Sequence, residues 1–415
     1  MRDMKDSEIE WIHNIPASWA VMPNKYLMHK IKRIRPVYGG EDILSLTMKG
    51  VIVRDLDAGG KMPTSFNGYQ ELYPGNLLMC LFDIDVTPRC IGLIKQFGLS
   101  SPAYSQFVLN DGVDAAYYCY YYTMLDNDKT LLHLAKNLRH SLTEEQLGAV
   151  PTVVPPIEEQ KRIAAYLDAK CAETDSLTAD IQAQIDTLEQ YKRSVITEVV
   201  TKGLNPDAEM KDSGIQWIGK MPSHWDCIRG KYILKYIQKP VREDDGVITC
   251  FRDGEVTLRS NRREDGFTMA DKEIGYQGID VGDLVVHGMD GFAGAIGISD
   301  SRGKASPVLN VLNTKQNKRY IMYFLRSMAY SDVFLALATG IRVRSCDLRW
   351  NKLAELFYPV PPIEEQDAIV QHIDDVLHKV NEVIAQKKDQ LSVLEAYKKS
   401  LIFEYVTGKK EVPLA

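Results

Sequence analysis

The chain has 415 residues, of which 45% are hydrophobic and 26% charged, a balance typical of a globular protein with two or three domains. It contains no run of eighteen apolar residues and does not start like a signal peptide, and its seven scattered cysteines form no CxxC pair, so we expect a cytoplasmic protein without a membrane span, disulfide framework or zinc site. The formal net charge of −6 by itself argues weakly against nucleic-acid binding, because contacts with phosphates need lysine and arginine.

The opening segment of the chain occurs twice. DSEIEWIHNIPASW begins at Asp6 and DSGIQWIGKMPSHW begins at Asp212, a shift of 206 residues (212 − 6). The same shift relates the PPIEEQ at Pro155 to the PPIEEQ at Pro361 (361 − 155). Chance does not produce matched anchors at one offset, so the chain is one unit of roughly 206 residues used twice.

After its opening segment, each unit has an interior rich in short apolar runs. The first copy has ILSLTM, GVIVRD and NLLMCLF within residues 20–150, and the second has GVITCF, EVTLRS and DLVVHGM. Such runs, broken by Gly, Pro, Asn and Asp, predict strands joined by turns. The longer stretches YYTMLDNDKTLLHLAKNL and KRYIMYFLRSMAYSDVFLALA predict helices. The fold class is therefore mixed α/β (α+β), with one such globular domain in each copy.

The interiors of the two copies differ more than their flanks. GYQ at Gly68 and Gly275, and the SP dipeptides within SSPAY at Ser100 and ASPVL at Ala305, match at offsets of 207 and 205 residues, but most of the rest does not align. A constant frame around a variable interior is what two related but distinct binding specificities require. The alternative is drift in loops after an old duplication.

After each Pro-Pro dipeptide the pattern changes to one long helix, which ends near Gly203 in the first copy. Proline suits a helix start, and the two carboxylates of IEEQ lie where the helix dipole favours them. Imperfect heptads predict that the two helices pair as an antiparallel coiled coil; the alternative is that each packs only on its own domain. The expected seam residues are Ile163, Leu167, Thr174, Leu177, Ile181, Leu188, Tyr191 and Val195, then Ile369, Ile373, Val376, Val380, Val383, Lys387, Leu394, Tyr397 and Leu401.

The chain thus divides into four segments, namely a domain at 1–154, a helix at 155–204, a domain at 205–360 and a helix at 361–415. The first helical segment has 6 basic and 9 acidic residues and the second has 7 and 10, so each carries a net charge of −3. Because these two segments account for the net charge of −6, the two domains together are neutral. This distribution leaves room for a basic face on each domain.

Motifs of catalysis are absent from the sequence. We find no HExxH, no GxxxxGK[ST] phosphate loop and no GxSxG nucleophile elbow, and no Asn-Pro-Pro-Tyr or Asp-Pro-Pro-Tyr of an amino-methyltransferase. The histidines form no metal-spaced cluster, and the glycines of GFAGAIG lack the spacing of a dinucleotide fingerprint. We therefore expect a chain without a catalytic site, a metal or a cofactor of its own.

These features together resemble a known family. The opening DSGIQWIGKMPSHW, the SP dipeptide, PPIEEQ before a coiled-coil helix, and the duplication itself are similar to the specificity subunit of type I restriction-modification systems. The resemblance covers essentially the whole chain. The first copy departs from the pattern at Glu8 and His13, where the second has Gly214 and Gly219.

The resemblance implies two target recognition domains, each of which reads one half of a split sequence in double-stranded DNA. The coiled coil would set the spacer between the halves and dock two methyltransferase (modification) subunits, which bind S-adenosylmethionine and methylate adenine. A restriction/translocase subunit would join for cleavage. The chain itself would be a non-catalytic subunit that acts in the cytoplasm, away from membranes.

Arginine and lysine side chains are the candidates for DNA contact, because they reach both groove edges and phosphates. A basic set, Lys30, Lys32, Arg33 and Arg35, precedes the loop of the first copy. The candidates in or near the loops are Lys49, Arg54 and Lys61 in the first copy and Arg252, Arg259, Arg262, Arg263, Arg302, Lys304, Arg342 and Arg344 in the second. For any single residue, a solvated surface charge is the alternative.

Two further sets of repeated residues have candidate roles. Trp11, Trp19, Trp217 and Trp225 belong to the shared frame, which favours packing in the core over stacking on bases. The first turns of the long helices offer candidate partner-docking residues, with helix capping as the alternative. These are Glu158, Glu159 and Gln160, then Glu364, Glu365 and Gln366.

Two other functions stay open from the residues alone. One is a scaffold with two protein-binding modules on a coiled coil that never touches DNA, which the net charge of −6 favours slightly. The other is a self-sufficient nuclease or methyltransferase with unrecognised motifs.

Overall fold

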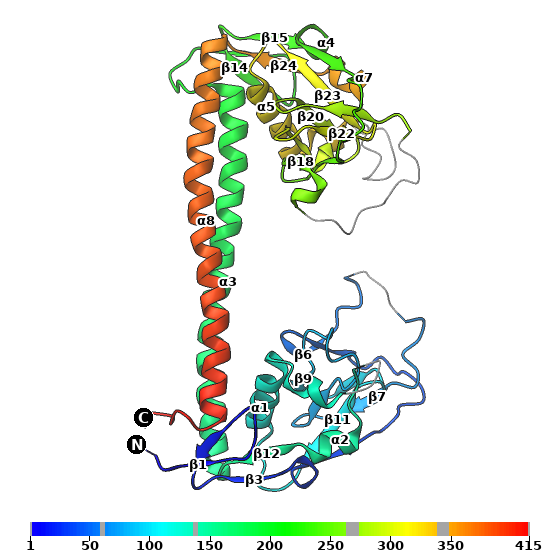
Figure 1. The fold of residues 1–415 in the computed structure, drawn as a ribbon, viewed down its shortest axis with the longest axis vertical. Helices are drawn as coiled ribbons and strands as arrows, with labels where there is room; N and C mark the ends of the chain where they lie inside the picture. The colour runs from blue at the N-terminus through cyan, green and yellow to red at the C-terminus, as the bar shows by residue number, and fades with distance from the viewer. Residues whose placement is uncertain (1, 59–62, 136–139, 263–273, 338–347, 414–415) are drawn as a thin grey trace. The chain divides into compact units, whose positions relative to one another are not determined.

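The computed structural model describes residues 2–58, 63–135, 140–262, 274–337 and 348–413 (Figure 1). Contacts between residues divide the chain into two compact units. The first consists of Met1–Ile181 with Asp389–Ala415, and the second is Gln182–Lys388. Each unit therefore combines one of the globular segments with a part of both long helices.

The first unit is built on a four-stranded antiparallel sheet with smaller strand pairs around it. The sheet has the order β4 (Met28–Ile31), β11 (Ser105–Leu109), β8 (Leu77–Met79), β9 (Ile91–Leu93). The strand pairs are β1 (Met4–Asp6) with β2 (Asn14–Pro16), β3 (Ala20–Pro23) with β12 (Pro151–Val154), β5 (Leu44–Thr47) with β6 (Gly50–Val53), and β7 (Gln70–Leu72) with β10 (Gly98–Ser100). Helices α1 (Ala115–Asn127) and α2 (Glu144–Ala149) and the 3-10 turns η1 (Asn24–Tyr26) and η2 (Thr130–Leu134) complete it.

The second unit repeats this topology. Its central sheet has the order β16 (Leu234–Ile237), β23 (Leu309–Thr314), β20 (Leu284–His287), β21 (Ile296–Ile298). The strand pairs are β13 (Met210–Asp212) with β14 (Lys220–Pro222), β15 (Asp226–Arg229) with β24 (Phe357–Val360), β17 (Ile248–Cys250) with β18 (Val256–Leu258), and β19 (Gln277–Ile279) with β22 (Gly303–Ala305). Helical elements are α4 (Gly230–Ile233), α5 (Lys318–Tyr330), α6 (Val333–Ala336), α7 (Trp350–Glu355), η3 (Arg259–Asn261) and η4 (Gly291–Ala293). The matching strand orders confirm the mixed α/β fold used twice.

Helix boundaries inside the domains follow local capping. Helix α1 begins earlier than the sequence pattern predicts, because the Asp114 side chain accepts a hydrogen bond from Tyr117 N (2.8 Å) and caps the helix there. Asn317 caps α5 in the same way. The single helix expected from Lys318 onward is interrupted at Asp332, which adopts a left-handed conformation (φ 55°) between α5 and α6.

The repeated tryptophans Trp19 and Trp225 are fully buried, one in the core of each unit. Trp19 belongs to a cluster with Ile163 of the first long helix and Leu401 of the second. Trp225 belongs to a cluster that likewise includes residues of both long helices. The tryptophans of the shared frame therefore pack where domain and helices meet, and these two are not available for stacking on bases.

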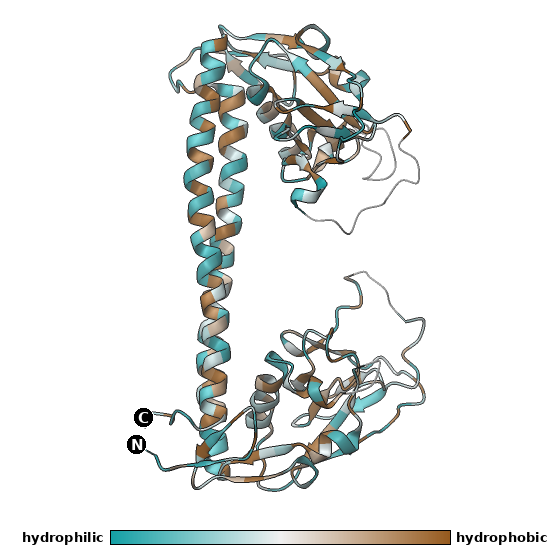
Figure 2. Ribbon diagram, viewed as in Figure 1, coloured by the Kyte–Doolittle hydropathy of each residue, from teal (hydrophilic) through white to brown (hydrophobic). Residues whose placement is uncertain are grey.

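The long helices are α3 (Ile157–Lys202) and α8 (Ile363–Val406), and they pair in antiparallel orientation within each unit. In the first unit, Lys398 Nζ lies 2.6 Å from Asp175 Oδ1, and the Tyr405 hydroxyl lies 3.2 Å from that of Tyr166. In the second unit, Lys387 donates to Gln184. The pairing of α3 with α8 is thus confirmed, and Figure 2 shows hydrophobic and hydrophilic residues alternating along both helices.

The second row of the expected helix seam is wrong at four positions, although Ile163 and Ile369 of that row are buried as predicted. Leu167, Ile181, Ile373 and Leu401 are buried as predicted, but Leu177, Tyr191, Val383 and Tyr397 are 40–50% exposed. The second row of the seam follows the first by four residues rather than preceding it by four, and its buried members include Cys171, Ile185, Val199 and Ile384. Spacings of four and three residues alternate in a coiled-coil seam. Apolar residues lie both four residues before and four residues after the first row, so the heptad pattern alone does not distinguish the two possible second rows.

Candidate nucleic-acid interface

The hairpin of β17 and β18 in the second unit has a tip that is fixed to the body of the unit. Its turn is closed by hydrogen bonds from Phe251 N to Glu255 O (2.8 Å) and from Gly254 N to Phe251 O (2.9 Å). Gly254 has φ +92°, and a Cβ there would lie 2.5 Å from Nη1 of Arg326. Arg326, from α5, donates to the carbonyl of Asp253 at 2.6 Å. A residue with a side chain could not replace Gly254 without displacing this arginine.

Arg262 folds back onto this tip from the end of η3. Its Nη2 lies 2.6 Å from Asp253 Oδ2, and its Nη1 donates to Glu255 Oε2 at 3.1 Å. The guanidinium carbon lies 4.2 Å from the centroid of the Phe251 ring, which is cation–π distance. Burial acts to raise the pKa of Asp253, but hydrogen bonds from Arg262 and from the amide of Glu255 lower it overall.

The other arginines predicted around this hairpin are also engaged. Arg252, at the tip, donates from Nη2 to Asp290 Oδ1 at 2.8 Å, and its side chain remains 64% exposed. Arg259 Nε lies 3.5 Å from Thr249 Oγ1. The structure therefore brings Arg252, Arg259 and Arg262 together on one hairpin, while Arg263 lies outside the described residues.

Arg302 belongs to a closed charge network beside β22. Its Nε and Nη2 donate to Asp245 at 2.9 and 2.8 Å, and its Nη1 donates to Asp280 at 2.6 Å. Lys239 donates to Asp280 and Asp283 at 2.8 and 2.5 Å. Hydrogen bonds from Lys239 and Arg302 lower the pKa of Asp280 to about 2. Every charge in this network has a partner of opposite sign, so its geometry indicates a role in holding the loops of the domain together.

The remaining residues predicted to contact DNA belong to both domains. Lys304 is half-buried on β22. Lys49 is exposed in the turn between β5 and β6, and Arg54 follows that hairpin with its amide bonded to Ile43 O (2.7 Å). Met48, beside Lys49, is 62% exposed. Lys61, Arg342 and Arg344 lie outside the described residues.

The first unit also has paired arginines, on the chain after β4. The Arg33 guanidinium carbon lies 5.1 Å from the centroid of the Tyr73 ring, and Arg33 Nη1 donates to the Tyr73 hydroxyl at 3.2 Å. Arg35 pairs with Glu41 at 2.7 Å and with Glu71 at 3.1 Å. The sequence pattern predicted Arg33 and Arg35 only as members of a basic set. It did not predict their pairing with aromatic and acidic side chains, which are distant in sequence.

The glutamines of the two PPIEEQ motifs are fully buried. Gln160 Oε1 accepts from the backbone amide of Asp114 at 2.8 Å, and Gln366 Oε1 accepts from that of Asn317 at 3.0 Å. The Nε2 of each donates to the carbonyl of the first proline of its motif, at 2.8 and 2.9 Å. Each glutamine therefore ties the start of a long helix to the cap of a domain helix, and this buried position leaves no polar atom for a partner protein.

The glutamates of the same motifs lie in two environments. Glu158 and Glu364 are exposed in the first turns of α3 and α8. Glu159 is buried and accepts from Trp19 Nε1 at 2.9 Å, and Glu365 lies 2.8 Å from His224 Nε2. Glu158 and Glu364 are thus the members of the predicted docking set that present their carboxylates to solvent.

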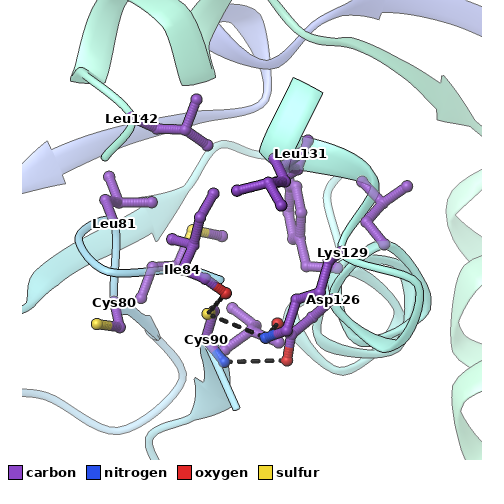
Figure 3. Close-up of a pocket in the computed structure, with 13 residues that line it drawn as sticks. Cys80, Leu81, Ile84, Cys90, Asp126, Lys129, Leu131 and Leu142 are labelled. Carbon is purple, nitrogen blue, oxygen red and sulfur yellow. Dashed lines mark hydrogen bonds and ion pairs between the residues drawn. The ribbon is translucent and has the colours of Figure 1, made fainter. Parts of the chain in front are cut away.

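A small cavity of about 30 Å³ lies in the first unit between β8, β9, α1 and η2. Figure 3 shows its apolar wall, with Leu81, Leu131 and Leu142, and a polar corner in which Asp126 and Lys129 lie beside Cys90. Burial raises the pKa of the Cys90 thiol to about 12, which keeps it protonated and unreactive at neutral pH. A volume of this size holds at most a few water molecules, which is too small for a substrate site.

Within the described residues, no group of three or more His, Cys, Asp or Glu side chains has an arrangement that could hold a metal ion. None of the described helices is both long and apolar enough to cross a membrane.

Comparison with known proteins identifies distant relatives. The chain is 24% identical over 284 residues to a protein described as the specificity subunit of the type I restriction enzyme MjaX of Methanocaldococcus jannaschii, and 25% identical over 276 residues to the MjaVIII specificity subunit of the same organism. These matches cover 66% and 62% of this chain and 62% of each relative. No protein-family model matches the chain.

A solved structure shares the fold. A chain from a structure of a type I restriction-modification system superposes with a TM-score of 0.68 at 14% identity, covering 95% of this chain and 99% of that one. The similarity to type I specificity subunits inferred from the repeated motifs is thus confirmed by the sequence relatives, and the fold by this structural match.

Proposed function

We propose that this chain, a distant relative of the specificity subunits of type I restriction-modification systems, selects the DNA sequence on which such a complex acts. Each of the two globular segments, 1–154 and 205–360, reads one half of a split target in double-stranded DNA. The helical segments 155–204 and 361–415 set the unspecified gap between the halves. The chain itself is non-catalytic.

The observation that carries this proposal is the contrast between one frame and two different hairpin tips. Both units have the same strand order and the same buried tryptophan and glutamine. The β5–β6 tip presents Met48 and Lys49, whereas the β17–β18 tip presents Arg252 with Asp253. Two domains that share a backbone plan and differ in their exposed polar groups are suited to reading two different half-sites.

Partner subunits supply the chemistry in this proposal. Two methyltransferase subunits, which bind S-adenosylmethionine, dock on the paired helices, and a restriction/translocase subunit joins them in the cytoplasm. Glu158 and Glu364 are exposed at equivalent positions of α3 and α8, so an acidic contact of this kind is offered twice. Duplicated docking sites fit two copies of one partner.

The test is co-expression of the full chain with the methyltransferase subunit encoded beside it, followed by genome-wide mapping of methylated adenine. A split motif, with two short defined parts around a fixed gap, is the expected result. A stable complex that methylates nothing and does not bind duplex DNA would instead support the scaffold function, which the closed charge network of Arg302 favours. Methylation by the isolated chain would show that the chain is itself an enzyme.

A further inference from the structure

The tip of the β17–β18 hairpin is a rigid platform. Beside the contacts of Arg326 described above, a Cβ on Gly297 of β21 would lie 1.9 Å from the carbonyl oxygen of Gly254. Val256 O accepts from Asp300 N at 3.0 Å, which fastens the start of β18 to the same side of the domain. The backbone of the tip therefore has little room to move relative to the sheet that supports it.

Arg262 is held on this platform in a single orientation. The carboxylates of Asp253 and Glu255 bind its terminal nitrogens, and its guanidinium carbon lies 4.2 Å from the centroid of the Phe251 ring. Asp253 is itself fixed, because its Oδ1 accepts from the amide of Glu255 at 3.1 Å. The side chain of Arg262 nevertheless remains 39% exposed. An arginine on a free surface loses rotamer entropy when it binds, and here part of that loss has already occurred on folding.

We propose that Arg262 is a specificity-determining residue that reads a guanine edge in the half-site of the second domain, with Asp253, Glu255 and Phe251 as its positioning residues. This inference rests on the proposed function. A guanidinium has five N–H donors in a fixed fork, and the two carboxylates occupy two of them. The remaining donors suffice for the O6 and N7 acceptors of guanine, which arginine recognises in a bidentate manner.

A phosphate contact would be a different use of the same charge. Asp253 and Glu255 lie within 3.1 Å of Arg262, and their negative charges repel a phosphate group. The electrostatic penalty from the same carboxylates is smaller when Arg262 contacts a neutral base edge. The carboxylates also fix the orientation of the guanidinium, which base reading needs. The two roles therefore predict opposite effects when the carboxylates are neutralised.

The experiment uses the full complex and the target found by methylation mapping. Binding and methylation are measured on a series of duplexes in which each defined base pair is changed in turn. R262A is expected to reduce the preference for G·C by about 5- to 150-fold at one position of one half-site, and to leave the other half-site and the salt dependence of binding unchanged. Unchanged preferences at the other positions of the same half-site report that the second domain is folded.

The matched control is R229A. Arg229 also lies over an aromatic ring, 5.1 Å from the centroid of Phe357, and also pairs with a carboxylate, Glu355, at 3.1 Å. It lies on β15, in the strand pair that occurs in both units, and is expected to leave every base preference unchanged. A loss of selectivity in both variants would point to a general effect of removing a surface arginine and would overturn the proposal.

The double variant D253N/E255Q separates base reading from phosphate contact. The amide side chain that D253N introduces keeps an oxygen to accept from the backbone amide of residue 255, so the turn is preserved. Base reading predicts weaker discrimination at the same position as in R262A. A uniform gain in affinity on all sequences, or an R262A variant that weakens all sequences equally and lowers the salt slope by about 1, would show a phosphate contact instead. A wild-type complex without a split motif would overturn the proposed function and this inference with it.

Discussion

Two groups of charged side chains in the second domain look alike in the sequence and differ in the structure. Arg302 donates to Asp245, whose side chain is almost fully buried, and to Asp280 inside a network in which each charge is matched. Arg262 lies on an exposed tip, and among the described residues its two carboxylate partners take two of its five N–H donors. The hydrogen bonds of Arg302 stabilise the fold, whereas part of the hydrogen-bonding capacity of Arg262 is available to a ligand.

The Arg302 network makes stability depend on pH in a defined window. The folded-state pKa of Asp280 is about 2, below the 3.8 of a free aspartate. Ionised Asp280 therefore stabilises the folded domain above pH 4, and this contribution is lost as the pH falls toward 2. We expect D280N to lower the urea midpoint of unfolding at pH 6, and the difference from wild type to shrink steadily below pH 4.

The effect should be modest, because the Asp280 side chain is 42% exposed and solvent screens its interactions. Asp244, exposed and close in sequence to the network, provides the control, and D244N should behave as wild type at every pH. A D280N effect that stays constant down to pH 3 would mean that the substitution acts through packing and not through charge.

On the scale of helices, the seam between α3 and α8 can be tested with neighbouring residues. Ile384 is 4% exposed, whereas Val383, which the sequence pattern placed in the seam, is 40% exposed. We expect I384A to destabilise the second unit by about 2–4 kcal/mol through loss of buried surface and a residual cavity. V383A should change the free energy of unfolding by less than about 0.5 kcal/mol, and equal effects in urea denaturation would contradict the seam of the structure.

Much of the element plan was predictable because it depends on local or repeated signals. The offset of 206 residues required two units of one topology, and PPIEEQ marked the first turn of each long helix. The phase of the seam was not predictable, because Leu177 and Ile185 are both apolar and only packing distinguishes them. The candidate site was likewise predictable only in part.

A run of arginines at 252–263 indicated a basic cluster, and the structure brings its described members to one hairpin. The partner of Arg252 could not be inferred, since Asp290 is 38 residues away in the sequence. The burial of Gln160 and Gln366 was equally hidden, because a glutamine in the first turn of a helix is usually solvated. Long-range partners decide these roles, and a single sequence does not display them.

For the chain as a whole, the repeated frame predicts that specificity can be exchanged by halves. We expect replacement of residues 20–150 with the equivalent segment of another family member to change one half of the methylated motif and to keep the other half and the gap. The reason is that the exchanged segment leaves the second domain and both long helices intact. Methylation mapping of the chimeric complex provides the measurement, and a change in both halves would show that the domains do not read independently.

The order in which the chain is synthesised is the reverse of the order in which its units can be completed. Gln182–Lys388 is continuous, whereas the first unit needs Asp389–Ala415, whose Leu401, Ile402 and Tyr405 share a core with Ile12 and Trp19. At ~5–20 residues per second on the ribosome, roughly 10 to 50 s pass between Ile181 and the final residue. Throughout this time the apolar surface that Asp389–Ala415 covers is exposed and open to chaperone binding. Translation that stops just after Lys388 leaves the second unit whole and the first one open.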